Sequence, residues 1–203
     1  MMLDAGFMTL ADLKARILPT GQESREQWDV DLQDIGKGVA ESFNNYCNRV
    51  FQRNEQAVYN RTACRHSICV DNYPIESIDT IAVDYGSGDM DFIQDDVFTL
   101  GRKAGVIEFA YRLGLYFDRV EVIYTGGFWL DDGNPMPAGA TPLPFDVRDA
   151  YVRQVQSICE KRGLFHTVSI RRSESKDSGS ELDTLAMLKG VKEILKRYMR
   201  YSF

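Results

Sequence analysis

The 203-residue chain has few of the residues that build metal centres or disulfide frameworks. It contains two histidines and four cysteines, and the cysteines form no Cys-x-x-Cys pair. Cys64, His66 and Cys69 lie close together in the sequence, but structural zinc takes four ligands, and the other histidine, His166, is far along the chain. We therefore expect no metal and no cofactor. The cysteines are interpreted as buried or half-buried thiols in a reducing compartment.

Long apolar runs and an excess of basic residues are also missing. No run approaches the roughly 20 apolar residues of a bilayer span, and residues 1–10 lack the charged start and long apolar stretch of a signal peptide. We expect a soluble, non-exported protein with no membrane contact. The 24 Lys and Arg residues stand against 30 Asp and Glu residues, for a net charge of −6. This balance argues against a strongly basic surface that grips nucleic acid.

What the chain does contain is a strong helical period. Apolar residues recur every three or four positions from Trp28 to Val50, which predicts one long helix over 24–53, opened by Ser24 and Gln27 as a capping box. Such a stripe favours a core position over a partner-binding face. Gly36 and Gly38 are interpreted as marks of a close helix crossing. Shorter helices are predicted over 9–18, begun by Thr9, and over 146–162, capped by Asp146.

Between these helices the chain changes to short segments rich in β-branched and aromatic residues, separated by turn residues. This texture predicts an antiparallel β unit inserted over about 56–128. Five strands are expected, over 57–70, 77–85, 90–100, 105–113 and 119–125. A proline-rich loop follows over 131–144.

The predicted fold class is therefore α+β: a helical bundle core with an inserted antiparallel β unit and a separate C-terminal helix after a flexible linker. Residues 1–166 are expected to form one domain. The polar, serine-rich stretch 167–181 is interpreted as the linker, and 182–203 as the last helix.

No catalytic motif stands out. There is no Gly-x-Ser-x-Gly, and neither histidine lies in a recognisable catalytic pattern. Gly86-Ser87-Gly88 predicts a hairpin turn, because no lysine and no helix follow it as in a phosphate-binding loop. The aspartates over 89–96 lack the glycine and terminal glutamate of an EF-hand. We expect a protein that is not an enzyme.

Charge is distributed unevenly. Residues 71–96 hold eight acids and no Lys or Arg, whereas 182–203 hold five basic residues and two acids. A solvated sheet surface and an ordinary helix end would explain both. The alternative is that the acidic and basic faces meet between neighbouring copies, in a head-to-tail interface that closes into a ring.

Several motifs follow one another in order: Thr9–Lys14, Tyr46–Phe51, Tyr73–Ile78, Val122–Phe128 and Pro144–Ala150. In this order they resemble the head–tail connector (adaptor) proteins of tailed bacteriophages. The most specific piece is Tyr-Thr-Gly-Gly-Phe at 124–128, followed by Pro144 and Asp-x-Arg-x-Ala at 146–150. The large β insertion, the long proline loop and the C-terminal helix depart from the family pattern.

The resemblance implies a structural virion protein. It would form a homo-dodecameric ring under the portal in the virion neck, after assembly in the host cytoplasm. The ring would extend the DNA channel, let double-stranded DNA pass without specific binding, and offer a platform to the stopper or tail-completion protein. We then expect part of the acidic run to face the channel or a neighbouring subunit's basic surface, namely Asp84, Asp89, Asp91, Asp95 and Asp96.

The linker would let the C-terminal helix reach the portal. Its expected docking residues are Leu185, Leu188, Leu195, Tyr198, Lys192 and Arg197. The alternative is that this helix packs on its own core. Three other functions stay open: another neck or tail-completion protein, a packaging factor that binds nucleic acid through the basic C-terminal helix, and a small hydrolase with a paired His and nucleophile.

Overall fold

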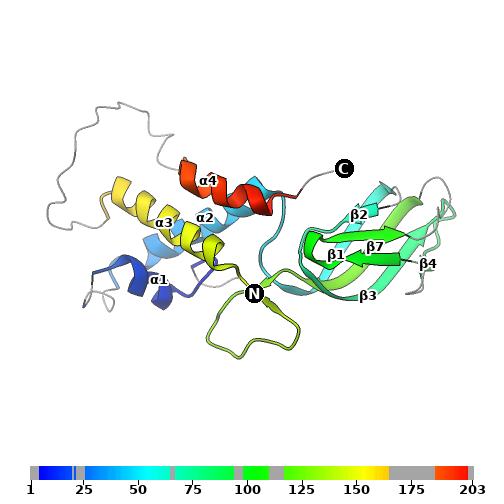
Figure 1. The fold of residues 1–203 in the computed structure, drawn as a ribbon, viewed down its shortest axis with the longest axis horizontal. Coiled ribbons are helices and arrows are strands. Elements are labelled where there is room, and N and C mark those ends of the chain that lie inside the picture. Colours follow the sequence, from blue (N-terminus) through cyan, green and yellow to red (C-terminus); the bar gives the residue numbers. More distant parts are fainter. Residues whose placement is uncertain are drawn as a thin grey trace. The chain divides into compact units, whose positions relative to one another are not determined.

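The computed structural model describes residues 5–19, 21, 26–64, 67–93, 98–109, 117–164 and 186–200, and of residues 61–64 and 117–118 the backbone only. It confirms the predicted α+β class, with helices and antiparallel sheets in one chain (Figure 1). The chain divides into two compact units. The helical unit consists of Met1–Tyr46 and Pro144–Tyr198, and the β unit of Cys47–Leu143 and Met199–Phe203.

Within the described residues the helical unit is built from α1 (Leu10–Ile17), α2 (Asp29–Cys47), α3 (Phe145–Lys161), α4 (Lys189–Leu195) and a 3₁₀ turn, Lys196–Tyr198. The last residue of α2, Cys47, is grouped with the β unit. The core of the helical unit contains fully buried residues from all four helices: Leu13, Leu32, Phe43, Tyr151 and Leu195. The rings of Phe43 and Tyr151 meet edge-on with centroids 6.3 Å apart. The apolar stripe of α2 therefore packs into the core of the helical unit, as predicted.

Two helices begin and end within one residue of their predicted bounds. The Thr9 side chain accepts a hydrogen bond from the Asp12 backbone N–H at 3.2 Å, which is the expected N-cap of α1. α3 begins at Phe145, one residue before its predicted start, with Pro144 rather than Asp146 at the N-cap position.

The long helix is shorter than predicted. α2 spans Asp29–Cys47 instead of 24–53. It ends because Asn48 adopts a left-handed conformation with φ of 50°, after which Val50 and Gln52 form isolated bridges with other segments. Val50 keeps the helical spacing but is 37% exposed. The predicted cap Ser24 lies outside the described residues.

The prediction for the C-terminal helix was also too long. Residues 186–188 are not helical, and α4 begins only at Lys189. The cause is Gln154 on α3, whose buried side chain donates to the Ala186 carbonyl at 3.3 Å and accepts from the Leu188 N–H at 2.9 Å. Residues 182–185, 201–203 and the expected linker 167–181 lie outside the described residues.

The prediction of a close crossing is correct for one of the two glycines of α2. A Cβ on Gly36 would lie 2.6 Å from the Tyr151 hydroxyl and 2.7 Å from the Ala5 carbonyl oxygen. A Cβ on Gly38 would meet nothing within 4 Å. Gly36 therefore permits the approach of α3 and the N-terminal segment, whereas Gly38 lies on an open face.

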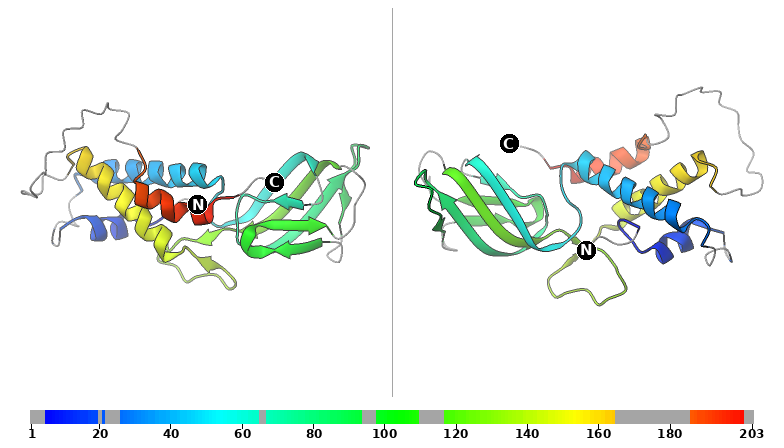
Figure 2. Two further views of the ribbon diagram at one scale, coloured as in Figure 1. Left: turned by 45° about the horizontal axis from the view of Figure 1, so that its top comes forward. Right: turned by 180° about the vertical axis from the view of Figure 1, so that it is seen from behind.

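The β unit contains two antiparallel sheets. The larger one has the order β1-β7-β3-β4, from Asn54–Cys64, Phe117–Gly126, Ile75–Asp84 and Asp91–Phe92. The smaller one has the order β2-β6-β5, from Ser67–Cys69, Val106–Phe109 and Phe98–Gly101. Inward residues of both sheets share one core, which includes Tyr59, Val83, Ile107, Val122 and Tyr124. Figure 2 shows the two sheets facing one another.

Two of the five predicted strands are each divided between the sheets. The segment 57–70 supplies β1 to the larger sheet and β2 to the smaller one, and 90–100 supplies β4 and β5 in the same way. Apolar side chains that pack into the core occur both before and after the point where each segment changes from one sheet to the other. The apolar pattern is therefore continuous although the pairing partner changes.

The proline-rich segment forms a loop between two short strands, β8 (Phe128–Trp129) and β9 (Thr141–Pro142), which pair in parallel. Residues 131–136 are exposed, with Met136 at 48%. Asp131 and Asp132 accept hydrogen bonds from the Gly133 and Asn134 N–H groups at 3.1 and 3.0 Å. The loop stands out from its two anchoring strands (Figure 1).

Candidate interaction surfaces

Within the described residues, no group of three or more His, Cys, Asp and Glu side chains is close enough to hold a metal ion. Burial raises the pKa of the Cys47 and Cys159 thiols to about 12, although nearby Arg49 and Arg162 act in the other direction. Thiols with so high a pKa are poor nucleophiles at neutral pH. None of the described helices is both long and apolar enough to cross a membrane.

The acidic run 71–96 separates into two groups. Asp71 and Glu76 are bound by arginines: the Arg200 guanidinium pairs with Asp71, and the Arg53 guanidinium pairs with Glu76 at 2.9 Å. The hydrogen bond that Arg53 donates to Glu76 raises the pKa of Arg53, against the opposing effect of burial. The Glu76 carboxylate is mostly buried, with 10% of its side chain exposed, whereas 48% of the Asp71 side chain is exposed.

The remaining described acids of the run lie on β3, β4 and the turn between them. The Asp84 side chain accepts from the Gly86 and Gly88 N–H groups at 2.8 and 3.1 Å, which fixes the turn predicted from Gly86-Ser87-Gly88. Asp89 and Asp91 are exposed. The structure thus brings Asp84, Asp89 and Asp91 into one hairpin. Asp95 and Asp96 lie outside the described residues.

The same hairpin carries exposed aromatic side chains. Phe92 on β4 is 76% exposed and lies opposite Ala82 on β3, and Tyr85 is 45% exposed. On the outward face of the same sheet, Val58 on β1 is 60% exposed and lies opposite Ile123 on β7. Exposed aromatic side chains are enriched at protein-binding surfaces, and the rims of such surfaces are polar. In the sequence, a phenylalanine directly after an aspartate in β4 is the signal that could have indicated an exposed Phe92.

The predicted portal-docking residues of the C-terminal helix have different environments. Leu195 is fully buried and Leu188 is partly buried in the helical unit, where α4 packs against α3. The Tyr198 hydroxyl donates to Asp146 at 2.7 Å. Of the two alternatives for this helix, the described part adopts the packing on its own unit. Lys192 and Arg197 are exposed, and Leu185 lies outside the described residues.

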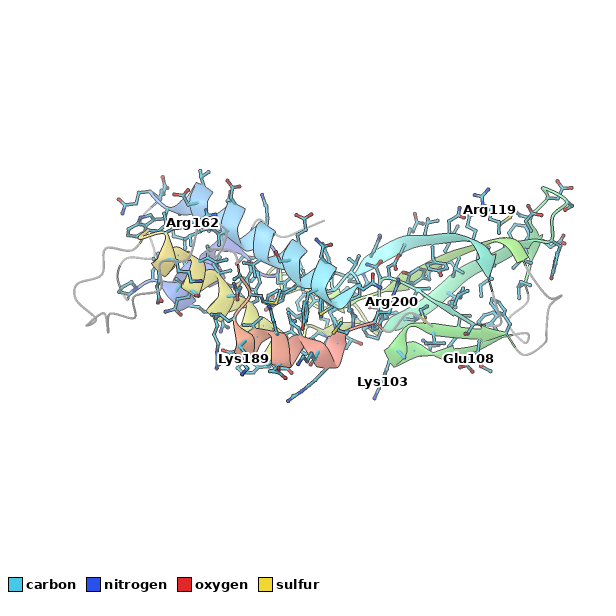
Figure 3. The ribbon with its side chains drawn as sticks, turned by 90° about the horizontal axis from the view of Figure 1, so that it is seen from above. Lys103, Glu108, Arg119, Arg162, Lys189 and Arg200 are labelled. Carbon is cyan, nitrogen blue, oxygen red and sulfur yellow. The ribbon has the colours of Figure 1, made fainter. Side chains whose placement is uncertain are left out.

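Exposed cations lie along α4. Lys189, Lys192 and Lys196 share the face turned away from the buried Val191 and Leu195. Lys189 is placed at the start of the helix in Figure 3. Lys196 pairs with Glu193 at 2.8 Å, and Arg197 lies 4.0 Å from Asp146. Within the described part of the chain, Lys189 and Lys192 have no ion pair.

Sequence reasoning missed the most elaborate cluster of the β unit. Arg49 is 4% exposed, and its guanidinium carbon lies 3.4 Å from the centroid of the Tyr73 ring, with Phe51 and Phe128 at 4.7 and 5.0 Å. Its Nη2 donates to the Tyr73 carbonyl. The available signal in the sequence was Asn-Arg-Val-Phe, in which an isolated arginine directly precedes two apolar residues after a helix.

The most specific resemblance motif has a structural role next to this cluster. The Tyr124 hydroxyl accepts from the Asn72 N–H at 3.0 Å. A Cβ on Gly126 or Gly127 would lie 2.4 Å from the Asn72 carbonyl oxygen and 2.5 Å from the Gln52 carbonyl oxygen, respectively. Tyr-Thr-Gly-Gly-Phe therefore lets three backbone segments approach one another closely at the base of the β unit.

No protein-family model and no curated protein matches this chain. Several chains of solved structures share its fold, and two of them come from structures of particle necks. One, described as "Neck of empty GTA particle computed with C6 symmetry", has a TM-score of 0.55 and 14% identity, over 96% of this chain and 90% of that chain. GTA denotes a gene transfer agent. The other, "Neck of native GTA particle computed with C12 symmetry", has a TM-score of 0.51 and 12% identity, over 96% and 89%. At these identities the likeness establishes the fold that this chain shares with them.

Proposed function

We propose that this chain is a structural neck protein of a phage-like particle, a head–tail connector whose copies form a ring. The observation that carries the proposal is a fold shared over 96% of the chain with a protein from a particle neck. The order of the sequence motifs from Thr9 to Ala150 supports the same proposal independently of the structure. The two lines of support are separate, since the identity to the neck protein is only 14%.

The symmetries of the two neck structures, C6 and C12, support a cyclic arrangement of identical copies. We propose a dodecamer that sits under the portal, carries the stopper or tail-completion protein below, and surrounds passing double-stranded DNA. The chain would work as a building block without catalysis, in the virion neck, after assembly in the host cytoplasm. The absence of a basic excess suits a channel that DNA must leave freely, because each phosphate-binding cation adds salt-dependent affinity.

The residues predicted to face the portal differ in their exposure. Docking through Leu195 would require α4 to leave its own unit, since that side chain is fully buried. The exposed Lys192 and Arg197 are available without unpacking. Portal contact through these two cations stays a prediction, and the variant Lys192→Glu/Arg197→Glu tests it by loss of portal binding.

Imaging of assembled particles tests the proposed function. We expect density for this chain in the neck, between head and tail, with cyclic order. Mass measurement of the purified chain, alone and mixed with the portal, gives the copy number. Particles that lack the chain in the neck, or contain it there without cyclic order, would contradict the proposal.

The packaging-factor alternative rests on the exposed lysines of α4. It predicts salt-sensitive binding of the isolated protein to double-stranded DNA. A connector predicts little binding at physiological salt, so a fluorescence-polarisation titration at two salt concentrations separates the two functions.

A further inference from the structure

Two described surfaces of opposite charge present groups that lack an ionic partner. One is the hairpin surface, formed by Tyr85, Asp89, Asp91 and Phe92 of the β unit. The other is the α4 surface, formed by Lys189, Lys192 and Lys196 of the helical unit. In the described part of the chain, Asp89, Asp91, Lys189 and Lys192 form no salt bridge.

Hydrogen bonds within the hairpin fix the conformation of the hairpin surface. Asp84 binds two backbone N–H groups of the turn, and β4 pairs with β3 through Ala82–Phe92 and Val83–Asp91. Phe92 nevertheless leaves 76% of its side chain in solvent. Asp91 and Phe92 are successive residues of β4, so their side chains leave opposite faces of the sheet at its edge. A partner that docks against this edge can contact the exposed aromatic ring and the acids together, as an interface centre with a polar rim. Figure 1 shows β4 at the edge of its sheet.

The α4 surface is complementary to the hairpin surface in charge and chemistry. Its lysines are held on one side of the helix because Val191 and Leu195 are buried on the other. Lysine combines an ammonium group, which can pair with a carboxylate or lie over an aromatic ring, with an aliphatic stem that packs on apolar surface. The hairpin surface offers both kinds of partner.

We propose that the hairpin surface of one copy docks on the α4 surface of the next copy. The inference rests on the proposed function, a ring of identical subunits, and names the contact that would build it. The two surfaces differ, so the contact is head-to-tail and repeats from copy to copy until the ring closes. Asp89 and Asp91 pair with Lys189 and Lys192, and the Phe92 ring lies against the lysine stems.

Charge reversal tests the contact in the full-length protein. The acid-reversed variant is Asp89→Lys/Asp91→Lys, and the base-reversed variant is Lys189→Glu/Lys192→Glu. Each alone places like charges opposite one another and is expected to weaken self-association by roughly tenfold in sedimentation experiments. The association of the unmodified protein is expected to weaken with rising salt.

Mixing the two variants decides whether the contact joins separate chains. In an equimolar mixture each contact again joins opposite charges if the variants alternate, so association is expected to recover. Recovery in the mixture cannot arise from a contact within one chain. Matched controls place the same charge changes elsewhere on exposed positions: Asp34→Lys/Glu41→Lys and Lys37→Glu/Lys103→Glu.

Phe92→Ser provides a second test without a change of charge. It is expected to weaken self-association while the melting temperature stays the same, because the side chain is mostly in solvent. Normal association of this variant and of both reversed variants would overturn the proposal. So would a protein that does not self-associate up to millimolar concentration.

Other outcomes separate this inference from the function on which it rests. If the base-reversed variant loses portal binding but still self-associates, the lysines face the portal and the inference is wrong. If reversed variants enter the neck in normal rings, this contact is rejected while the connector function stands. If the chain is absent from the neck, the connector function is rejected on separate evidence.

Discussion

The guanidinium of Arg49 lies against the ring of Tyr73, with its central carbon 3.4 Å from the ring centroid. The same guanidinium donates to the Tyr73 backbone carbonyl, so one buried side chain binds both the ring and the backbone of the same residue. Arg49 follows the end of α2, and Tyr73 precedes β3. The contact therefore fixes two segments at the point where the chain enters the β unit.

We expect Arg49→Ala to destabilise the β unit by roughly 3 kcal/mol, because a desolvated cation–π contact and a charged hydrogen bond are lost together. Arg49→Lys should recover less than half, since an ammonium group cannot stack as a plane. Urea unfolding followed by tryptophan fluorescence gives both values. The control Arg119→Ala, at an exposed site on β7 shown in Figure 3, should cost about 0.5 kcal/mol or less. Equal losses at both sites would contradict the assigned role.

The two glycines of α2 should respond in opposite directions to the same change. Gly38→Ala adds a methyl group where nothing lies within 4 Å and is expected to stabilise the helical unit by about 0.5–1 kcal/mol. Gly36→Ala forces its Cβ against the Tyr151 hydroxyl and the Ala5 carbonyl, and should destabilise by about 2 kcal/mol. Thermal unfolding of the pair measures the difference, and a stabilised Gly36→Ala variant would show that the crossing is looser than described.

Alkaline pH should destabilise the fold. Burial raises the pKa of Cys47 and Cys159 from 9.0 to about 12, and that of Tyr124 from 10.0 to about 12. The unfolded thiols ionise first, so stability that is complete below pH 9 is lost as the pH rises toward 12, at up to about 1.4 kcal/mol per pH unit for each group. Denaturant melts between pH 8 and pH 10 test the slope. Cys47→Ala/Cys159→Ala should flatten it between pH 9 and 10, and an unchanged slope would contradict the assignment.

Gln154 should control the order of α4. Gln154→Met removes the partners of the Ala186 carbonyl and the Leu188 N–H, at a cost of about 1–3 kcal/mol. Hydrogen exchange of residues 189–198 is expected to rise markedly. Gln156→Met, which loses only an exposed bond to Glu160, is the matched control and should leave the exchange unchanged. Faster exchange in the control as well would indicate a general loosening of α3.

The parts of the fold that could be predicted from the sequence are those decided by neighbours in the chain. Thr9 caps α1 through a residue three positions on, and Gly86 and Gly88 form the expected turn. The errors arise where distant residues decide. Ala186 to Leu188 have the composition of a helix, but they are not helical, because the side chain of Gln154, more than 30 positions away in sequence, binds their backbone.

The candidate surfaces also depend partly on neighbours in the chain and partly on distant residues. The excess of acids over 71–96 was visible in the sequence, but only the fold shows that Asp71 and Glu76 are bound by arginines while Asp89 and Asp91 remain exposed. The apolar spacing of the last helix indicated an amphipathic element without indicating what covers it. The structure places Leu195 in its own unit and leaves the lysines outside.

The chain returns to the β unit after α4: Met199–Phe203 are grouped with it, and Arg200 donates from its backbone to the Cys47 carbonyl at 2.8 Å and from its guanidinium to Asp71. The polypeptide therefore crosses between the two units three times rather than twice. A cassette of residues 47–143 transplanted into another protein of this fold would arrive without this arginine, and Asp71 would lose its cation. Any exchange of the β unit between proteins of this fold has to carry Arg200 with it.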